Sequence, residues 1–179
     1  MRMNVSDESL AQAAAGGDGA AFATLLDRVY DKIFGLAFRL TGSRADAEDL
    51  VQDICAALPG KLGGFRGDSK FTTWLFRITV NATHDRRRRH ASYARATEGW
   101  GDWELAQRAE QAETAERLDW LRLAMDTLTP PEIRETLILV LDGLSHKEVA
   151  QVLDVSEGTV SWRISEAKKK LKRMKEAEV

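Results

Sequence analysis

The stretch that decides the fold is LSHKEVAQVLDVSEGTVSWRI, residues 144–164. It predicts two short helices joined by a tight Asp-Val turn. Ser145 can cap the first helix, and Glu148 follows three residues later, which is the spacing of a capping box. Ser156 can cap the second helix. This plan is typical of a helix-turn-helix, whose second helix enters the major groove of DNA.

The second helix of the pair has one apolar side. Val160, Ile164, Ala167 and Leu171 recur at helical spacing, so we expect them to face inward. An ordinary helical hairpin is the alternative that this pattern alone leaves open. The opposite face carries the side chains that would meet DNA, which are Ser161, Trp162, Ser165, Glu166 and Lys169.

Composition excludes several classes of protein. The chain has 179 residues, of which 44% are hydrophobic and 30% charged. No apolar run approaches the roughly 20 residues of a membrane-spanning helix, and no signal peptide is evident, so we expect a cytoplasmic protein without membrane insertion. One cysteine and three scattered histidines predict neither a disulfide nor a metal site. Because no P-loop or nucleophile-elbow motif is present, we expect no cofactor and no enzymatic activity.

The charge is distributed unevenly. The formal net charge is −2, whereas proteins that bind DNA strongly by themselves are usually basic. Basic residues concentrate in two runs, 86–89 and 168–175. This distribution predicts a protein that binds DNA weakly alone and gains affinity inside a larger assembly.

The whole chain is predicted to be all-α, because proline is rare and β-branched alternation is scarce. Glycines make 60–69 a loop. Two small helical domains are expected, 1–90 and 118–179, joined by a flexible acidic linker at 91–117. The helices are expected near 7–16, 18–41, 43–58, 70–90, 114–128, 131–142, 145–153 and 156–175.

Three motifs accompany the helix-turn-helix. They are DAEDLVQDI at 46–54, FRGDSKFTTWLFRITVNATHDRRRR at 65–89 and LTPPEIRETLILVLDGLSHKEVA at 128–150. In this order and spacing they resemble a bacterial sigma factor of the extracytoplasmic-function (ECF) group, in the sigma-70 family. The resemblance implies a subunit that binds core RNA polymerase and directs promoter-specific initiation. It also implies that region 2 of the family recognises and melts the −10 element, and that region 4 recognises the −35 element.

The resemblance assigns the first motif to polymerase binding. An acidic face would dock on the clamp of the largest subunit and favour encounter more than raw affinity. The resemblance also implies that the protein contacts the flap of the polymerase. Without the family, a solvated acidic face is the simpler interpretation. The residues concerned are Glu48, Asp49, Gln52 and Asp53.

The second motif is assigned to the −10 element. A base that has left the stack would enter a pocket beside the glycine-rich loop and be held by aromatic stacking and hydrogen bonds. Trp74 is expected mainly in the core. The candidates for this base are Phe65, Arg66, Asp68, Lys70 and Asn81, and those for phosphates are Arg86, Arg87, Arg88 and Arg89.

The −35 element would be recognised by the second helix of the helix-turn-helix. Trp162 and Glu166 stand where the family commonly carries small or basic residues, so no particular −35 sequence can be inherited from the resemblance. The candidates are Ser156, Thr159, Ser161, Trp162, Arg163, Ser165, Glu166 and Lys169.

Two questions stay open in the sequence. Trp100 and Trp103 of the linker either follow a path through the polymerase or pack between the two domains. A stand-alone helix-turn-helix regulator explains residues 118–175 equally well but leaves 43–90 unexplained. The resemblance further implies regulation by an anti-sigma factor, whose identity no residue reveals.

Overall fold

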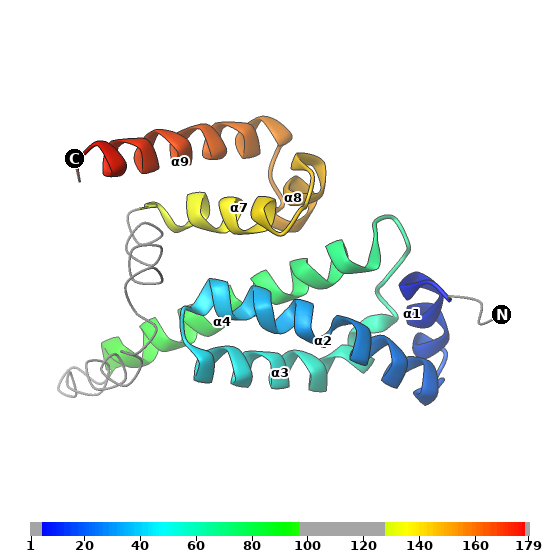
Figure 1. Ribbon diagram of the computed structural model, residues 1–179. Helices are drawn as coiled ribbons and strands as arrows, with labels where there is room; N and C mark the ends of the chain where they lie inside the picture. The colour runs from blue at the N-terminus through cyan, green and yellow to red at the C-terminus, as the bar shows by residue number, and fades with distance from the viewer. Residues whose placement is uncertain (1–4, 97–127, 178–179) are drawn as a thin grey trace.

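The computed structural model describes residues 5–96 and 128–177, and these residues form helices without any strand (Figure 1). The all-α prediction is therefore confirmed for them. The expected helix at 114–128 lies almost wholly outside the described residues, as do Trp100 and Trp103. The N-terminal domain consists of α1 (Asp7–Ala15), α2 (Gly19–Thr41), α3 (Arg44–Leu62) and α4 (Phe71–Ala96). The C-terminal domain consists of α7 (Pro131–Leu141), α8 (His146–Leu153) and α9 (Glu157–Ala177).

The N-terminal domain surrounds one apolar core. Leu25, Val29 and Ile33 recur every four residues along α2 and are fully buried. They pack in one cluster with buried side chains of α1, α3 and α4, among them Leu50 and Phe71. Because each helix contributes one apolar stripe, the four helices are held by burial of these stripes.

Helix α3 is longer than the sequence suggests. It was predicted to end near residue 58, but it continues through Pro59 and Gly60 to Leu62. Proline in a helix interior costs about 3 kcal/mol. Leu58 and Leu62 are almost completely buried one turn apart, and each such burial contributes about 1.5–3 kcal/mol. Packing therefore offsets the local helix breakers, and the predicted loop at 60–69 shrinks to 63–70.

Helix α4 also extends beyond its predicted end at residue 90 and reaches Ala96. The sequence of 90–96 contains no glycine or proline, and alanine and arginine are good helix formers. The arginine run at 86–89 consequently lies inside the helix rather than at its end.

The helix-turn-helix is confirmed in detail. The Ser145 hydroxyl accepts the Glu148 N–H at 3.3 Å, and the Glu148 carboxylate accepts the Ser145 N–H at 2.9 Å. These two bonds are the predicted capping box. Asp154 ends α8 with a left-handed φ of 54°. The Ser156 hydroxyl then accepts the Thr159 N–H at 3.1 Å and caps α9.

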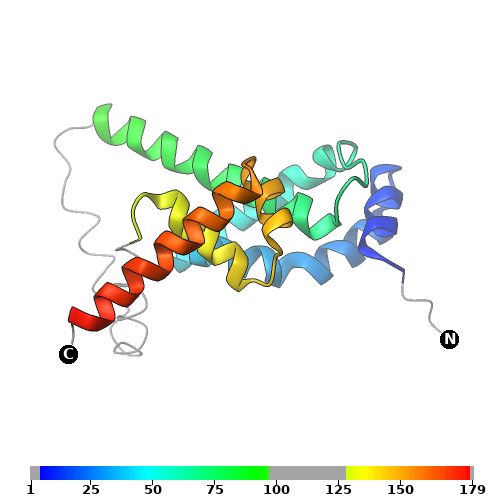
Figure 2. The same cartoon turned by 90° about the horizontal axis from the view of Figure 1, so that it is seen from above.

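The two domains pack against each other, with α7 on α2 and α8 on α4 (Figures 1 and 2). Their contact is apolar at its centre. Side chains from both domains form a single buried group, here called the shared cluster. Its members are Leu36, Leu40, Phe76 and Val80 of the N-terminal domain and Ile138, Leu139, Val149, Ala150, Val152 and Val160 of the C-terminal domain. Within the described residues, no helix combines the length and apolarity needed to cross a membrane.

Candidate nucleic-acid interface

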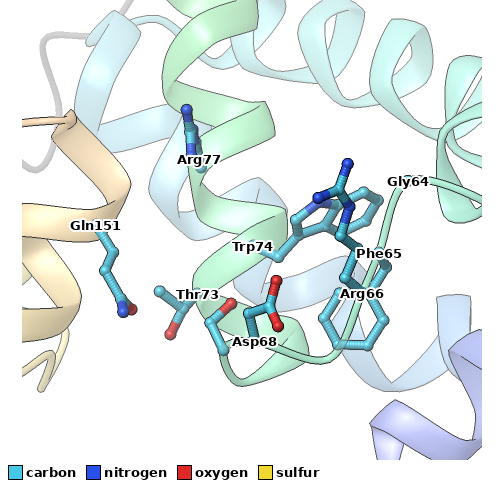
Figure 3. Close-up of a pocket in the computed structure, with 9 residues that line it drawn as sticks. Gly64, Phe65, Arg66, Asp68, Thr73, Trp74, Arg77 and Gln151 are labelled. Carbon is cyan, nitrogen blue, oxygen red and sulfur yellow. The ribbon is translucent and has the colours of Figure 1, made fainter.

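A cavity of about 410 Å³, here called the loop pocket, lies between loop 63–70, the first turns of α4 and α8 (Figure 3). The loop contributes both aromatic and charged side chains, and Gln151 of α8 lies on the side opposite to Phe65. Gly67 turns the loop with a φ of 78°, a backbone conformation that glycine adopts without strain. The lining residues are Gly64, Phe65, Arg66, Asp68, Ser69, Thr73, Trp74, Arg77 and Gln151.

The aromatic wall of the loop pocket is fixed to the core. The Phe65 ring meets buried Phe71 edge-on at a centroid distance of 5.3 Å and lies 5.5 Å from Trp74. Phe65 and Trp74 are both partly buried against the core cluster. The expectation that Trp74 belongs mainly to the core is confirmed, and Phe65 shares this support. The pocket therefore combines rigid aromatic rings with the exposed polar side chains of Arg66 and Asp68.

Asn81 lines a different cavity from Phe65. It faces a groove of about 610 Å³ between α3 and α4, here called the α3–α4 groove. The structure therefore does not bring these two side chains together around one cavity, and their joint contact with one base stays a prediction. Asn81 follows Trp74 by seven residues, which is two helical turns, so the groove continues the same face of α4. Its lining residues are Leu50, Asp53, Ile54, Ala57, Lys61, Ile78, Asn81, Ala82, Asp85, Arg86 and Arg89.

The four arginines of α4 do not act as one group. Arg86 bonds both Asp46 and Asp49 at 3.1 Å, Arg88 pairs with Asp85, and Arg89 lines the α3–α4 groove. Consecutive helical residues project about 100° apart, so four in a row point in four directions. Phosphate binding by Arg86, Arg87, Arg88 and Arg89 stays a prediction, and in this arrangement of the chain Arg86, Arg87 and Arg88 are paired with carboxylates.

The acidic face of α3 meets the basic face of α4. Asp49, expected to bind polymerase, is bonded to Arg86, and Glu48 pairs with Arg44 at 2.8 Å. Gln52 and Asp53 are exposed. The two surfaces that the sequence assigned to different partners are therefore physically joined through Arg86.

The outer face of α9 is oriented as predicted. Trp162 is 57% exposed, and Ser161, Ser165 and Lys169 are also exposed. The Glu166 carboxylate is bonded by Lys169 Nζ at 2.8 Å, and this bond is the main cause that lowers the pKa of Glu166. Glu166 is thus ionised and already paired within the helix.

Other members of the predicted α9 set have structural roles. Arg163 is half-buried, and its guanidinium donates to the hydroxyl of fully buried Thr136 at 3.4 Å. Ser156 and Thr159 form the helix cap. The sequence reasoning missed His146, whose ring nitrogen lies 3.1 Å from the Ser161 hydroxyl. The sequence signal for His146 was its place directly after the capping residue Ser145, in the first turn of α8, which packs against α9.

Comparison with known proteins identifies both domains. Residues 25–93 match sigma-70 region 2, and residues 118–171 match sigma-70 region 4. The ECF sigma-E factor of Haemophilus influenzae is 31% identical over 179 residues, covering 94% of each chain. The chain belongs to the ECF group of the sigma-70 family.

Two further comparisons support this ECF sigma factor assignment. The ECF sigma factor SigM of Mycobacterium tuberculosis is 34% identical over 171 residues, covering 94% of this chain and 84% of that protein. The solved structure of CnrH in complex with the cytosolic domain of CnrY superposes with a TM-score of 0.70 at 31% identity. It covers 97% of this chain and 99% of CnrH. The match at 25–93 removes the alternative of a stand-alone helix-turn-helix regulator, since that class explained only the C-terminal domain.

In this sigma factor, residues of the region 2 match are paired with the C-terminal domain. Lys70 Nζ lies 2.8 Å from the Glu148 carboxylate of the capping box. The pKa of Glu148 falls to about 2, first because Lys70 donates to it and then because of the Ser145 N–H. Lys70, expected at the −10 site, is therefore held by α8 and is not among the residues that line the loop pocket.

A second link centres on Glu135, which the sequence reasoning also missed. Its side chain is only 6% exposed, and His84 Nε2 lies 3.0 Å from both carboxylate oxygens. Arg87 pairs with the same carboxylate. Glu135 precedes Ile138 by three residues and Leu139 by four, so it falls on the apolar stripe of α7. A glutamate on an apolar stripe was the sequence signal for a buried carboxylate. The partners of Glu135 could not be found in this way, because His84 and Arg87 lie in the other domain.

Proposed function

We propose that the loop pocket holds one unstacked base of the −10 non-template strand. A pocket walled by Phe65 and Trp74 offers stacking to any base, and Arg66 and Asp68 offer hydrogen bonds to its edge. This aromatic pocket beside a sharp glycine turn is the observation that carries the proposal. Melting then requires no hydrolysis, because binding of the open strand shifts the equilibrium.

The strand would continue along α4 into the α3–α4 groove. Trp74 and Asn81 are separated by about 10 Å, at 1.5 Å per residue. This length corresponds to about three nucleotides at a rise of about 3.4 Å each. Asn81 is then placed to contact a second base, and Arg89 a phosphate. We place −35 recognition on Ser161, Trp162, Ser165, Glu166 and Lys169.

Polymerase binding is proposed to use the exposed end of the α3 acidic face. Gln52 and Asp53 carry this role best, because Asp49 and Glu48 already have partners within the chain. We propose 1–90 as the region that binds the clamp and the −10 element, and 118–179 as the region that binds the −35 element, with 91–117 as the linker between them. The site of action is the cytoplasm, where core polymerase and promoter DNA are present.

The packed arrangement is proposed to be a resting state. The −10 and −35 elements are about 25 base pairs apart, which is about 85 Å at about 3.4 Å per base pair. Here α8 borders the loop pocket itself, and Lys70 and Arg87 are paired with carboxylates of the C-terminal domain. The domains must therefore separate when the sigma factor joins core polymerase and promoter DNA.

A protein inhibitor would act by holding this closed state. CnrH has been solved with the cytosolic domain of another protein, CnrY, bound to it. A sigma factor with a fold similar at a TM-score of 0.70 and 22% identity, RpoE of Bartonella quintana, has been solved with its anti-sigma factor NepR. We propose an anti-sigma partner for this chain as well.

The base-capture proposal is tested with holoenzyme and labelled single-stranded −10 DNA. Replacing one nucleotide at a time by an abasic site should weaken wild-type binding at one position by about 5- to 150-fold, the loss of one stacked base. In Phe65→Ala that penalty should disappear. Phe34→Ala, which removes an aromatic ring from the same core away from the pocket, is the matched control. An abasic penalty that survives Phe65→Ala would exclude the loop pocket as the base site.

A further inference from the structure

The first turn of α4 is capped from another helix. A helix leaves its first N–H groups without partners inside the helix, and a side-chain oxygen just before it usually accepts one. The residue before α4 is Lys70, which has no acceptor. Instead the Glu8 carboxylate of α1 accepts the Phe71 N–H at 3.1 Å. A residue 63 positions earlier in the chain therefore supplies the cap.

The charge of Glu8 suits this position. Carboxylates are stabilised at helix N-termini by the N–H groups and the helix dipole. The pKa of Glu8 lies below its ordinary value, chiefly because of the bond from Phe71, and the charge of Lys70 adds to the effect. Helix α1 is held on its other side as well, where Asp7 pairs with Arg28 of α2 at 3.1 Å. Two neighbouring acids thus fix α1 to two different helices.

The capped residue adjoins the loop pocket. Phe71 is the point at which loop 63–70 becomes α4, and its buried ring supports the Phe65 ring edge-on. Because the Phe71 ring contacts the Phe65 ring, a shift of the backbone at Phe71 would also move the Phe65 ring in the loop pocket. Helix α1 itself precedes the region 2 match, which begins at residue 25.

We propose that Glu8 is a positioning residue for −10 recognition. Its carboxylate fixes the start of α4, and through Phe71 it fixes the orientation of Phe65 in the loop pocket. This inference depends on the proposed role of the loop pocket. If the inference holds, α1, which lies outside the region 2 match, contributes to recognition of the −10 element.

The test uses holoenzyme assembled with full-length Glu8→Ala, Glu8→Gln and Asp7→Asn. Asp7→Asn is the matched control, because it removes one charge from the same helical turn but breaks the link to α2. Glu8→Ala should weaken binding of single-stranded −10 DNA by about 3- to 30-fold, the range that loss of a helix cap produces. Glu8→Gln, which keeps an acceptor oxygen, should recover part of this loss.

A purely structural role for Glu8 gives a different pattern. In that case thermal unfolding would shift while the abasic-site penalty stayed at its wild-type size, and the inference would be overturned. The inference instead predicts a smaller penalty in Glu8→Ala, with binding to core polymerase and to −35 duplex unchanged. Asp7→Asn should keep the full penalty even if its melting temperature falls.

Phe65→Ala measured in parallel separates the two proposals. If Phe65→Ala removes the abasic penalty and Glu8→Ala does not reduce it, the loop pocket stands and the role of Glu8 is wrong. If Phe65→Ala leaves the penalty intact, the loop pocket does not hold the base, and both proposals fail.

Discussion

The N-terminal and C-terminal domains are stabilised in different ways. Helices α1–α4 bury their apolar stripes against one another in a core of their own. Among its described residues 128–177, the C-terminal domain has a small private group, Leu128, Ile133 and Ala167, and contributes most of its other buried apolar side chains to the shared cluster. The N-terminal domain, which carries the proposed −10 site, therefore has a complete core of its own. The C-terminal domain, which carries the proposed −35 site, buries part of its apolar surface against the N-terminal domain.

This difference has a consequence for initiation. In the proposed separation, the shared-cluster side chains of one domain lose contact with those of the other, and burial of apolar surface is worth about 25 cal/mol per Å². Core polymerase must supply new contacts that compensate for this loss. We therefore propose that the closed state is favoured in the free chain and that its opening is coupled to assembly.

The largest expected effect comes from Phe76→Ala, which removes the largest side chain of the shared cluster. Loss of a buried phenylalanine costs about 3–5 kcal/mol. We expect amide hydrogen exchange in α8 to accelerate strongly while α1–α3 keep more of their protection. Phe22→Ala, in the private core of the N-terminal domain, should destabilise α1–α3 without first releasing α8. If amide hydrogen exchange in Phe76→Ala accelerated equally in both domains, the claim that the N-terminal domain has its own independent core would be contradicted.

The next effect in size is expected for Glu135→Gln, which leaves His84 and Arg87 without their carboxylate. Removing one partner of a buried pair costs about 3–5 kcal/mol, but Arg87 is half-exposed and can turn to solvent. We therefore expect about 1–2 kcal/mol, near the cost of one charged hydrogen bond. Chemical denaturation gives the value, with exposed Glu132→Gln on the same helix as the control. A stability equal to that of the control would show that Glu135 does not link the domains.

A smaller, pH-dependent effect is expected from Glu148. Its pKa is depressed to about 2, so its contribution is present above its ordinary pKa and is lost as the pH falls toward 2. The pair with Lys70 lies at the surface and is worth only about 0–1 kcal/mol. Lys70→Met should raise the pKa of Glu148 yet leave it below normal, because the Ser145 N–H remains. A side-chain NMR titration measures this pKa, and an unchanged value would mean that Lys70 and Glu148 are not paired in solution.

The smallest effect on stability, though not on specificity, is expected for Glu166→Arg. It releases Lys169 and adds positive charge, so the salt dependence of −35 binding should steepen by about 1–2 in slope. The preferred base should also change. Glu176→Arg makes the same charge change near the far end of α9, where Glu176 pairs with Lys172 at 3.7 Å. If both variants show the same slope and preferences as the wild type, Glu166 does not face the groove.

Local features of the chain were predictable because their causes are local. The capping box of Ser145 and Glu148 and the outward face of α9 follow from spacing alone. The end of α3 was not predictable, because burial of Leu58 and Leu62 overrides the breakers at Pro59 and Gly60. The spacing of apolar residues in the sequence does not show how strongly one helix packs against another.

The site shows the same division. The sequence placed Phe65 correctly beside a glycine turn, but it could not show that Asn81 faces another groove. Nor could it show that Lys70 and Arg87 pair with carboxylates more than 45 residues away. Such pairs depend on how the domains meet, which no local pattern encodes.

The separation of the two domains can be measured directly by the distance between a probe on α3 and a probe on α9. Ala56→Cys and Lys172→Cys are exposed labelling positions. Native Cys55, whose thiol pKa is raised by burial, is replaced by serine. Energy transfer between the two dyes should report a short distance in the free chain. With core polymerase and promoter DNA, the distance should lengthen by tens of ångströms, on the scale of the promoter spacing of about 85 Å. A distance that stays at its free value in a transcribing complex would contradict the resting state proposed for the closed chain.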